Sequence, residues 1–195
     1  MYFPDLDYRQ DILKNLLSEK DIYNIGLGIK NGIHIVTLSS VESAADVQAA
    51  RQVVAQAGNS EIQLYSKIQS REGLAHFDEI LTASDGIIIA RGYLGMALED
   101  IDDVVYVQTY IINKCNTVGK PVVLQTQIMD SMIHRLRPTR SEVCDIAHAV
   151  NEGVDAMILS AETAVGCFYK EATSTMAKIC IETESNLDYV KRYFI

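Results

Sequence analysis

A lysine near the end of one apolar stretch is the first residue that could do chemistry in this sequence. With the two-residue period of a strand, Lys67 shares a face with Tyr65 and Gln69, while Leu64 and Ser66 lie on the other face. A cation at a strand end can bind an anion or act as a Schiff-base nucleophile. It can equally be a structural lysine whose ammonium group reaches solvent. The spacing by itself leaves these interpretations open.

Two further polar groups follow neighbouring apolar stretches. Arg91, Gly92 and Tyr93 begin a glycine-flanked segment, in which backbone N–H groups can converge on an anion. A plain tight turn is the alternative. Thr126 ends the next apolar stretch, where its hydroxyl can point to the same place or bond its own backbone. The segment of residues 160–163, after the last stretch, could supply a base or a cap for the next helix, and we expect capping.

The elements that position these residues alternate regularly along the chain. Short stretches rich in Val and Ile predict strands buried on both faces at residues 33–40, 62–68, 86–90, 121–127 and 155–160. Helical stretches are predicted at residues 45–57, 73–83, 100–118, 140–152 and 170–187. Capping boxes begin at Ser18 and Thr139, and left-handed glycines are expected at 32, 58, 119 and 153. This alternation predicts βαβ units and a parallel sheet.

A closed barrel and an open doubly wound sheet both satisfy that alternation. The Gly-x-Gly-x-x-Gly phosphate fingerprint of the dinucleotide-binding sheet is missing. Polar residues follow several different strands, namely Ser39, Ser40, Lys67, Gln69, Arg91, Thr126, Gln127, Ser160 and Glu162. In a barrel, the carboxyl ends of the strands form the catalytic rim. We therefore predict an α/β fold that is a partial (β/α)8 TIM barrel, about three βα units short on its N-terminal side.

The composition bears on the number of domains, the partners and the compartment of this protein. The 195 residues are 48% hydrophobic and contain no linker-like run, so we expect one globular unit over residues 1–195. A net charge of −9 argues against non-specific nucleic-acid binding. The four scattered cysteines form no zinc motif and favour a reducing compartment. We expect neither a signal peptide nor a membrane span, and hence a cytoplasmic protein.

Many short runs carry a family resemblance. They are LSEKD (17–21), SKI (66–68), EG (72–73), FDEI (77–80), ASDGI (83–87), ARG (90–92), CN (115–116), GKPV (119–122), TQ (126–127), SMI (131–133), RPTR (137–140), LS (159–160) and ETA (162–164). In this order and spacing, the chain resembles the barrel of pyruvate kinase from its fourth strand to its eighth, over about residues 16–187. The family's lid domain and C-terminal allosteric domain are expected to be absent from it.

The resemblance implies a reaction and a site. The family transfers the phosphoryl group of phosphoenolpyruvate to ADP, giving ATP and pyruvate, which leaves as an enolate. Lys67 matches the lysine that stabilises the phosphoryl group in flight, and Thr126 matches the threonine near the carbon that is protonated. Arg91, Gly92, Tyr93 and Thr126 match the substrate-binding positions. The resemblance also implies Mg²⁺, held at positions 69 and 93, and K⁺ bound by strands that precede this chain's first strand.

The chain departs from the family at both metal positions. Gln69 stands where the family has glutamate, and Tyr93 stands where it has aspartate. Mg²⁺ prefers anionic oxygen ligands, so two neutral donors should bind it weakly. Losing ~5 kcal/mol of metal assistance would slow phosphoryl transfer by roughly four powers of ten. Glu42, Ala161 and Val165 are further departures. We therefore predict low or no activity, as in a pseudoenzyme or truncated paralogue.

Three other hypotheses stay open. The chain could be part of an active pyruvate kinase with unusual metal ligands. It could be a lysine-dependent lyase that uses Lys67 as a Schiff base. It could be a non-catalytic module that pairs with a full-length relative through its strand edges. A five-stranded partial barrel leaves two unpaired edges and one uncovered face, so we expect self-association rather than a clean monomer.

Overall fold

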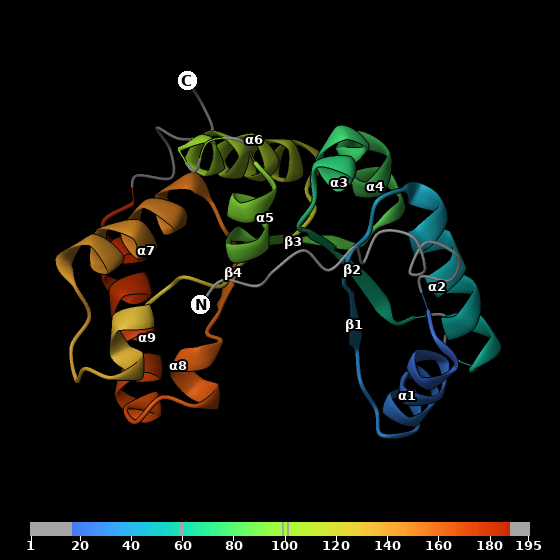
Figure 1. Cartoon of the computed structure of the whole chain (residues 1–195), viewed down its shortest axis with the longest axis horizontal. Coiled ribbons are helices and arrows are strands. Elements are labelled where there is room, and N and C mark those ends of the chain that lie inside the picture. The colour runs from blue at the N-terminus through green and yellow to red at the C-terminus, as the bar shows by residue number, and fades with distance from the viewer. Residues whose placement is uncertain (1–16, 59–60, 99, 101, 188–195) are drawn as a thin grey trace, which may run out of the picture.

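Five parallel strands form one curved sheet with helices on its outer side (Figure 1). The computed structural model describes residues 17–58, 61–98, 100 and 102–187. The strands lie in chain order: β1 (Ile35–Leu38), β2 (Gln63–Ile68), β3 (Gly86–Ala90), β4 (Val122–Gln125) and β5 (Ala156–Ile158). This arrangement confirms the predicted α/β fold of parallel βα units and fits part of a (β/α)8 barrel.

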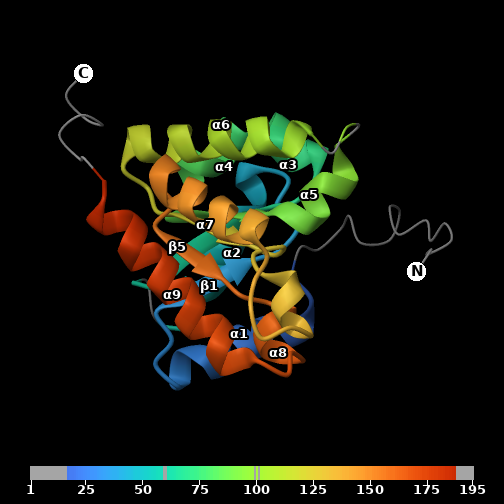
Figure 2. The same cartoon turned by 90° about the vertical axis from the view of Figure 1, so that its left-hand side faces the viewer.

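Helices alternate with the strands of the described residues, as the sequence pattern predicts, and short helices also follow several strand ends. They are α1 (Glu19–Lys30), α2 (Ala44–Gln56), α3 (Arg71–Ala75), α4 (Phe77–Ala83), α5 (Arg91–Ala97), α6 (Asp103–Val118), η1 (Asp130–Ile133), α7 (Arg140–Glu152), α8 (Ala161–Ala164) and α9 (Tyr169–Ser185). Helices α7 and α9 pack together beside β5 (Figure 2), and α1 lies beside β1 at the other end of the sheet (Figure 1).

Local sequence signals explain most helix ends. The capping boxes at Ser18 and Thr139 are both present, and the four expected glycines all have positive φ. The single helix predicted over residues 73–83 is instead two short helices that meet at His76. The glycine-flanked segment after β3 is also not a plain turn, because α5 begins there directly.

Burial differs between the central and the edge strands. Every residue of β3 is buried, and most residues of β2 and β4 are. The prediction of burial on both faces is wrong for β1 and β5, where Ile35 is 45% exposed and Ala156 is exposed. An edge strand has a sheet neighbour on one side only, so its side chains lack part of the cover that central strands receive.

Two aspartates fix the register at the amino ends of the strands. The backbone N–H of Asp85 donates to the Leu64 carbonyl (2.9 Å), and the Asp85 carboxylate accepts from the Leu64 N–H (2.8 Å). Asp155 makes the same two bonds to Val122, at 2.9 and 2.8 Å. Each aspartate thus adds one side chain–backbone hydrogen bond to the ladder between two strands. These bonds fix the register of β3 against β2 and of β5 against β4.

The inner face of the sheet is filled at its centre. Tyr65, Ile88 and Val123 are buried and pack together with Ile158. The Tyr65 ring lies across Gly86, its register partner on β3. The expectation of one uncovered face is therefore wrong for the central strands, because a large ring over a glycine fills the concave side. Burial raises the pKa of the Tyr65 phenol, and the carboxylates of Asp155 and Asp85 raise it further.

Candidate functional site

The carboxyl ends of β3 and β4 bring Gly92 and Thr126 into direct contact. The Gly92 N–H donates to Thr126 Oγ1 (2.9 Å), and that hydroxyl donates to the Gln125 carbonyl (2.6 Å). The threonine hydroxyl therefore bonds local backbone, as one of its two interpretations from the sequence predicted. It also accepts a hydrogen bond from Gly92, at the start of α5. An N–H of α5 and the hydroxyl of the residue that follows β4 thus lie together at one point of the rim.

The chain after β4 has an unusual backbone. Thr126 and Gln127 have φ values of 68° and 54°, in the left-handed region that residues with a side chain rarely adopt. Ser40, at the end of β1, is the third such residue in the described part of the chain, with φ 55°. Each such residue costs on the order of 1 kcal/mol, so the surrounding structure must hold it in place. No sequence signal indicated a left-handed backbone at these three residues.

Arg91 is the group that holds the Thr126–Gln127 turn. Its side chain is only 8% exposed. Nε donates to the Thr126 carbonyl (3.3 Å), and Nη2 donates to the Gln127 carbonyl. Nη1 lies 2.8 Å from both carboxylate oxygens of Asp145, on α7. Sequence reasoning missed Asp145, since it is separated by 54 positions from Arg91 and has no local motif.

A buried carboxylate connects the β4 loop to the end of β5. Glu162 is fully buried, and it accepts from the N–H groups of Met129 (2.9 Å) and Ser160 (2.8 Å). The expectation that the Ser160 hydroxyl caps the next helix is wrong. Its Oγ is buried and has no hydrogen-bond partner in the described structure. The side-chain bond at this helix start runs the other way, from the Ser160 N–H to the carboxylate of Glu162.

Carboxylates also surround the next turn of the β4 loop. Burial acts to raise the pKa of Glu142, but hydrogen bonds from Ser131 and Thr139 outweigh it and leave the pKa below its usual value. The pKa of Asp130 is shifted in the opposite direction. Burial raises its pKa, and Glu162 and Glu142 add to the effect, while Arg91 opposes it. The loop that carries Thr126 is therefore held by side chains from α5, α7 and α8.

Lys67 lies at the same rim, near the end of β2. It is half-buried and pairs in register with Ile88, and its side chain has no hydrogen bond or ion pair within residues 17–58, 61–98, 100 and 102–187. Gln69 follows it, and its Nε2 donates to Ser40 Oγ (2.8 Å). Tyr93, on α5, is 56% exposed. Because all strands are parallel, these residues lie at the same edge of the sheet as Gly92 and Thr126.

The two positions expected to hold Mg²⁺ do not fit that ion. Gln69 offers a neutral amide that already bonds Ser40, and Tyr93 offers a phenol. Nowhere among the described residues do three or more His, Cys, Asp or Glu side chains come together in a way that could hold a metal. Mg²⁺ binds hard, anionic oxygen donors in near-octahedral geometry. Positions 69 and 93 therefore offer no anionic oxygen to this ion.

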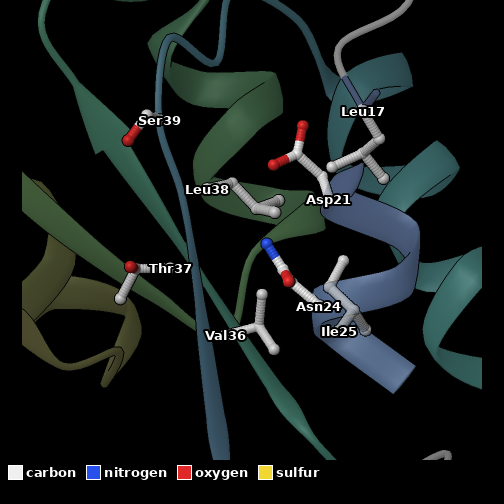
Figure 3. A pocket seen from close by; sticks show the side chains of 8 residues that line it. All are labelled: Leu17, Asp21, Asn24, Ile25, Val36, Thr37, Leu38 and Ser39. Carbon is white, nitrogen blue, oxygen red and sulfur yellow. The ribbon is translucent and has the colours of Figure 1, made fainter. Parts of the chain in front are cut away.

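A second feature lies along the outer edge of β1, where no other strand of the described residues pairs, and it extends to Ser39 at the carboxyl end of that strand. A cavity of about 240 Å³ separates α1 from this strand (Figure 3). Its lining consists of Leu17, Asp21, Asn24 and Ile25 from the α1 side, and Val36, Thr37, Leu38 and Ser39 from the β1 side. Three consecutive residues of β1 and the residue that follows them line this cavity along the strand's edge, because successive side chains point to opposite faces.

The fold and the rim define a segment of a (β/α)8-type barrel with its polar residues at the carboxyl ends of the strands. A family model described as pyruvate kinase, barrel domain, matches residues 9–173. The chain therefore belongs to the pyruvate kinase family.

Curated relatives agree with the family model. A pyruvate kinase of Clostridium acetobutylicum is 44% identical over 175 residues, which are 90% of this chain and 37% of that protein. A cytosolic isozyme of pyruvate kinase from Glycine max is 45% identical over 174 residues, covering 89% of this chain and 34% of the relative. The pyruvate kinase of Dictyostelium discoideum is 43% identical over 176 residues, with coverage of 89% and 34%. The chain thus spans about a third of the length of these relatives.

Proposed function

We propose that the β3–β4 rim of this chain binds a small phosphorylated carboxylate of the phosphoenolpyruvate class and transfers its phosphoryl group to ADP poorly or not at all. The observation that carries the proposal is the contact between the Gly92 N–H and Thr126 Oγ1 (2.9 Å). A carboxylate oxygen can replace the threonine hydroxyl as the acceptor of that N–H. Family membership supports phosphoenolpyruvate and pyruvate as ligands, with ADP and ATP as the nucleotides.

The proposed roles follow the family positions. Lys67 places at the rim a cation that has no ion-pair partner among the described residues, which suits a phosphoryl group that carries negative charge. Thr126 and the N–H groups of Gly92 and Tyr93 would hold the carboxylate end. Arg91 belongs to this site through the carbonyls that it fixes, because its guanidinium group is already bonded. We also propose that residues 1–195 act as one barrel-derived unit in the cytoplasm, without nucleic-acid partners.

Low activity is proposed because of the neutral donors at positions 69 and 93. Phosphoryl transfer depends on positioning and on neutralisation of charge, and a divalent ion supplies much of that neutralisation. A chain that keeps Lys67 but lacks both carboxylates can retain anion binding while losing turnover. The K⁺ implied by the resemblance stays a prediction. No helix in the described part of the chain has the length and apolar character needed to cross a bilayer.

Two measurements test this proposal. Isothermal titration with phosphoenolpyruvate should show weak binding that is lost in Lys67→Met, with Lys114→Met as a control at an outer ion pair. A coupled assay for pyruvate with ADP and Mg²⁺ or Mn²⁺ should show turnover at least about a thousandfold below that of a complete family member. Turnover at the level of the complete enzyme would refute low activity, and absent binding would refute the ligand site.

A second function is favoured by the cavity beside β1. Backbone groups of Ile35 and Thr37 face the free edge, because the His34 carbonyl bonds β2 and alternate residues of a parallel strand point to opposite sides. An unpaired edge with a cavity beside it can accept a further strand. We therefore propose, as the alternative, an interaction module that pairs with another family chain or with a second copy.

Light scattering at several protein concentrations tests that alternative. Association is expected, and Thr37→Pro should weaken it because proline removes the free-edge N–H. Val123→Ala, a buried change on β4, is a control for general loss of stability. A concentration-independent mass of 21.7 kDa would contradict self-association. The lysine-dependent lyase also stays a prediction, which borohydride trapping at Lys67 with keto acids would test.

A further inference from the structure

We propose that Arg91 and Asp145 form a positioning pair that fixes the strained turn at Thr126 and Gln127 and thereby sets the place of the Gly92 N–H and the Thr126 hydroxyl. Asp145 is assigned here a role that neither its sequence context nor the family comparison gives it. The ligand-binding consequence of this pair rests on the function proposed above, but the geometry of the turn does not.

The geometry of Arg91 supports a positioning role. Its guanidinium group uses all three nitrogens on protein atoms, namely two carbonyls of the β4 loop and the carboxylate of Asp145. The group is buried, so none of these bonds competes freely with water. A planar fork with several fixed donors can set the relative positions of two neighbouring carbonyls, which a lysine ammonium cannot do.

The two carbonyls belong to the residues that most need support. Thr126 and Gln127 are consecutive and both have positive φ. Without an external partner, residues with a side chain leave this region for extended or right-handed helical backbone. Such a change would rotate the peptide that carries the Thr126 side chain. It would therefore break the 2.9 Å contact with the Gly92 N–H.

Asp145 completes the pair in two ways. Its carboxylate compensates the charge of a guanidinium that is 8% exposed, and a buried unpaired cation would be costly. Its Oδ1 accepts from Nη1 at 2.8 Å, and Oδ2 lies 2.8 Å from the same nitrogen, so the carboxylate holds this end of the guanidinium group in place. Because Asp145 itself is 34% exposed, replacing it by asparagine opens no cavity in the core, and the cost of the change falls on the guanidinium of Arg91. It acts on the rim only through Arg91.

Hydrogen–deuterium exchange of the ligand-free chain, read by mass spectrometry, tests the positioning role. Asp145→Asn should raise exchange about tenfold in peptides covering residues 91–98 and 124–131, while peptides of α2 and β2 keep their rates. Asp145→Glu, which keeps the carboxylate, should restore the rates to within about twofold of the parent chain. Asp78→Asn removes a surface ion pair with Lys114 and is the matched control, expected to leave both peptides unchanged.

Arg91→Lys gives the same comparison from the other partner, and it remains informative if Asp145→Asn does not fold. It keeps the positive charge but loses the fork, so it should resemble Asp145→Asn. The proposal is overturned if Asp145→Asn leaves both peptides unchanged, if every peptide of the chain accelerates equally, or if Asp145→Glu fails to restore the rates.

Titration with phosphoenolpyruvate separates this inference from the proposed function. If the parent chain binds it, Asp145→Asn should weaken binding about tenfold, and Asp145→Glu should recover it. If the parent chain does not bind it, the ligand proposal fails, and the exchange rates alone still decide whether Arg91 and Asp145 fix the turn. Binding that is unchanged in Asp145→Asn would overturn the link between the pair and the site.

Discussion

The contact between Gly86 and the Tyr65 ring gives a prediction whose size can be worked out from the coordinates. A Cβ added at Gly86 would lie 2.6, 2.7 and 2.8 Å from Cζ, Cε2 and Cε1 of Tyr65. Ordinary van der Waals contact begins at 3.4 Å, so the ring must move by about 0.8 Å (3.4 − 2.6). The ring is buried against Ile88 and Val123 and has little room to do so.

Gly86→Ala is therefore expected to lower the free energy of unfolding. Overpacking of a filled core costs ~1–3 kcal/mol, while replacing glycine by alanine within a strand returns roughly 0.5–1 kcal/mol. The net loss should be about 1–2 kcal/mol, measured by urea unfolding followed by circular dichroism. Gly26→Ala on α1 is the control, because its added Cβ meets nothing within 4 Å. That change should be neutral or stabilising by up to ~1 kcal/mol.

A double-mutant cycle assigns the loss to the ring. In a Tyr65→Leu background the clash disappears, so Gly86→Ala should become neutral or stabilising, and the coupling between the two positions should be about 1–3 kcal/mol. The reasoning is refuted if Gly86→Ala is harmless in the parent chain. It is equally refuted if the loss is the same with leucine at position 65, because the ring would then not fill the inner face.

Three further predictions concern metal binding, pH and thiols. Gln69→Glu combined with Tyr93→Asp should raise Mn²⁺ affinity at least about tenfold in titration calorimetry, because it returns two anionic oxygen ligands, and unchanged affinity would argue against these positions as the metal site. The lowered pKa of Glu142 means that its ionised form stabilises the fold above the unfolded pKa of about 4.3, and that this contribution is lost as pH falls through the folded pKa. Glu142→Gln should thus lower stability at pH 7 and flatten the loss of stability between about pH 5 and 3 in urea titrations, and an unchanged acid limb would contradict this. Burial raises the pKa of the Cys115 thiol to about 12. At pH 8 the exposed Cys144 and Cys167 should therefore react with a disulfide reagent much faster than Cys115. A rapid reaction at Cys115 would show that this thiol is not buried as the structure has it.

Sequence reasoning succeeded where the signal is local. The strand at Gly86–Ala90 and the helix at Arg140–Glu152 have the bounds that were predicted. The apolar runs are short and flanked by glycines and caps, so backbone propensity and side-chain pattern agree there. Matching runs along the chain also indicated the family, and the family model bears this out.

It failed where an element depends on its neighbours. The segment after β3 contains two glycines and looked like a turn, yet it forms α5 over Arg91–Ala97. The Arg91 side chain at its start is bonded to the β4 loop and to α7, so tertiary contacts support a helix that propensity does not predict. The break at His76 is comparable, because its ring Nδ1 bonds the Glu42 carbonyl (2.9 Å) of another loop.

The sequence by itself determined the order of the strands and helices, the family, and the chemical types at the rim, including the neutral residues at the two positions that were predicted to hold a metal. All of these depend on residue identity and on spacing within a few positions. Only the tertiary structure decided which partners those residues take: Asp145 for Arg91, the Gly92 N–H for Thr126, and Ser40 for Gln69. Each pair joins segments at least 29 positions apart, and such contacts form only when the curvature of the sheet brings separate strand ends together.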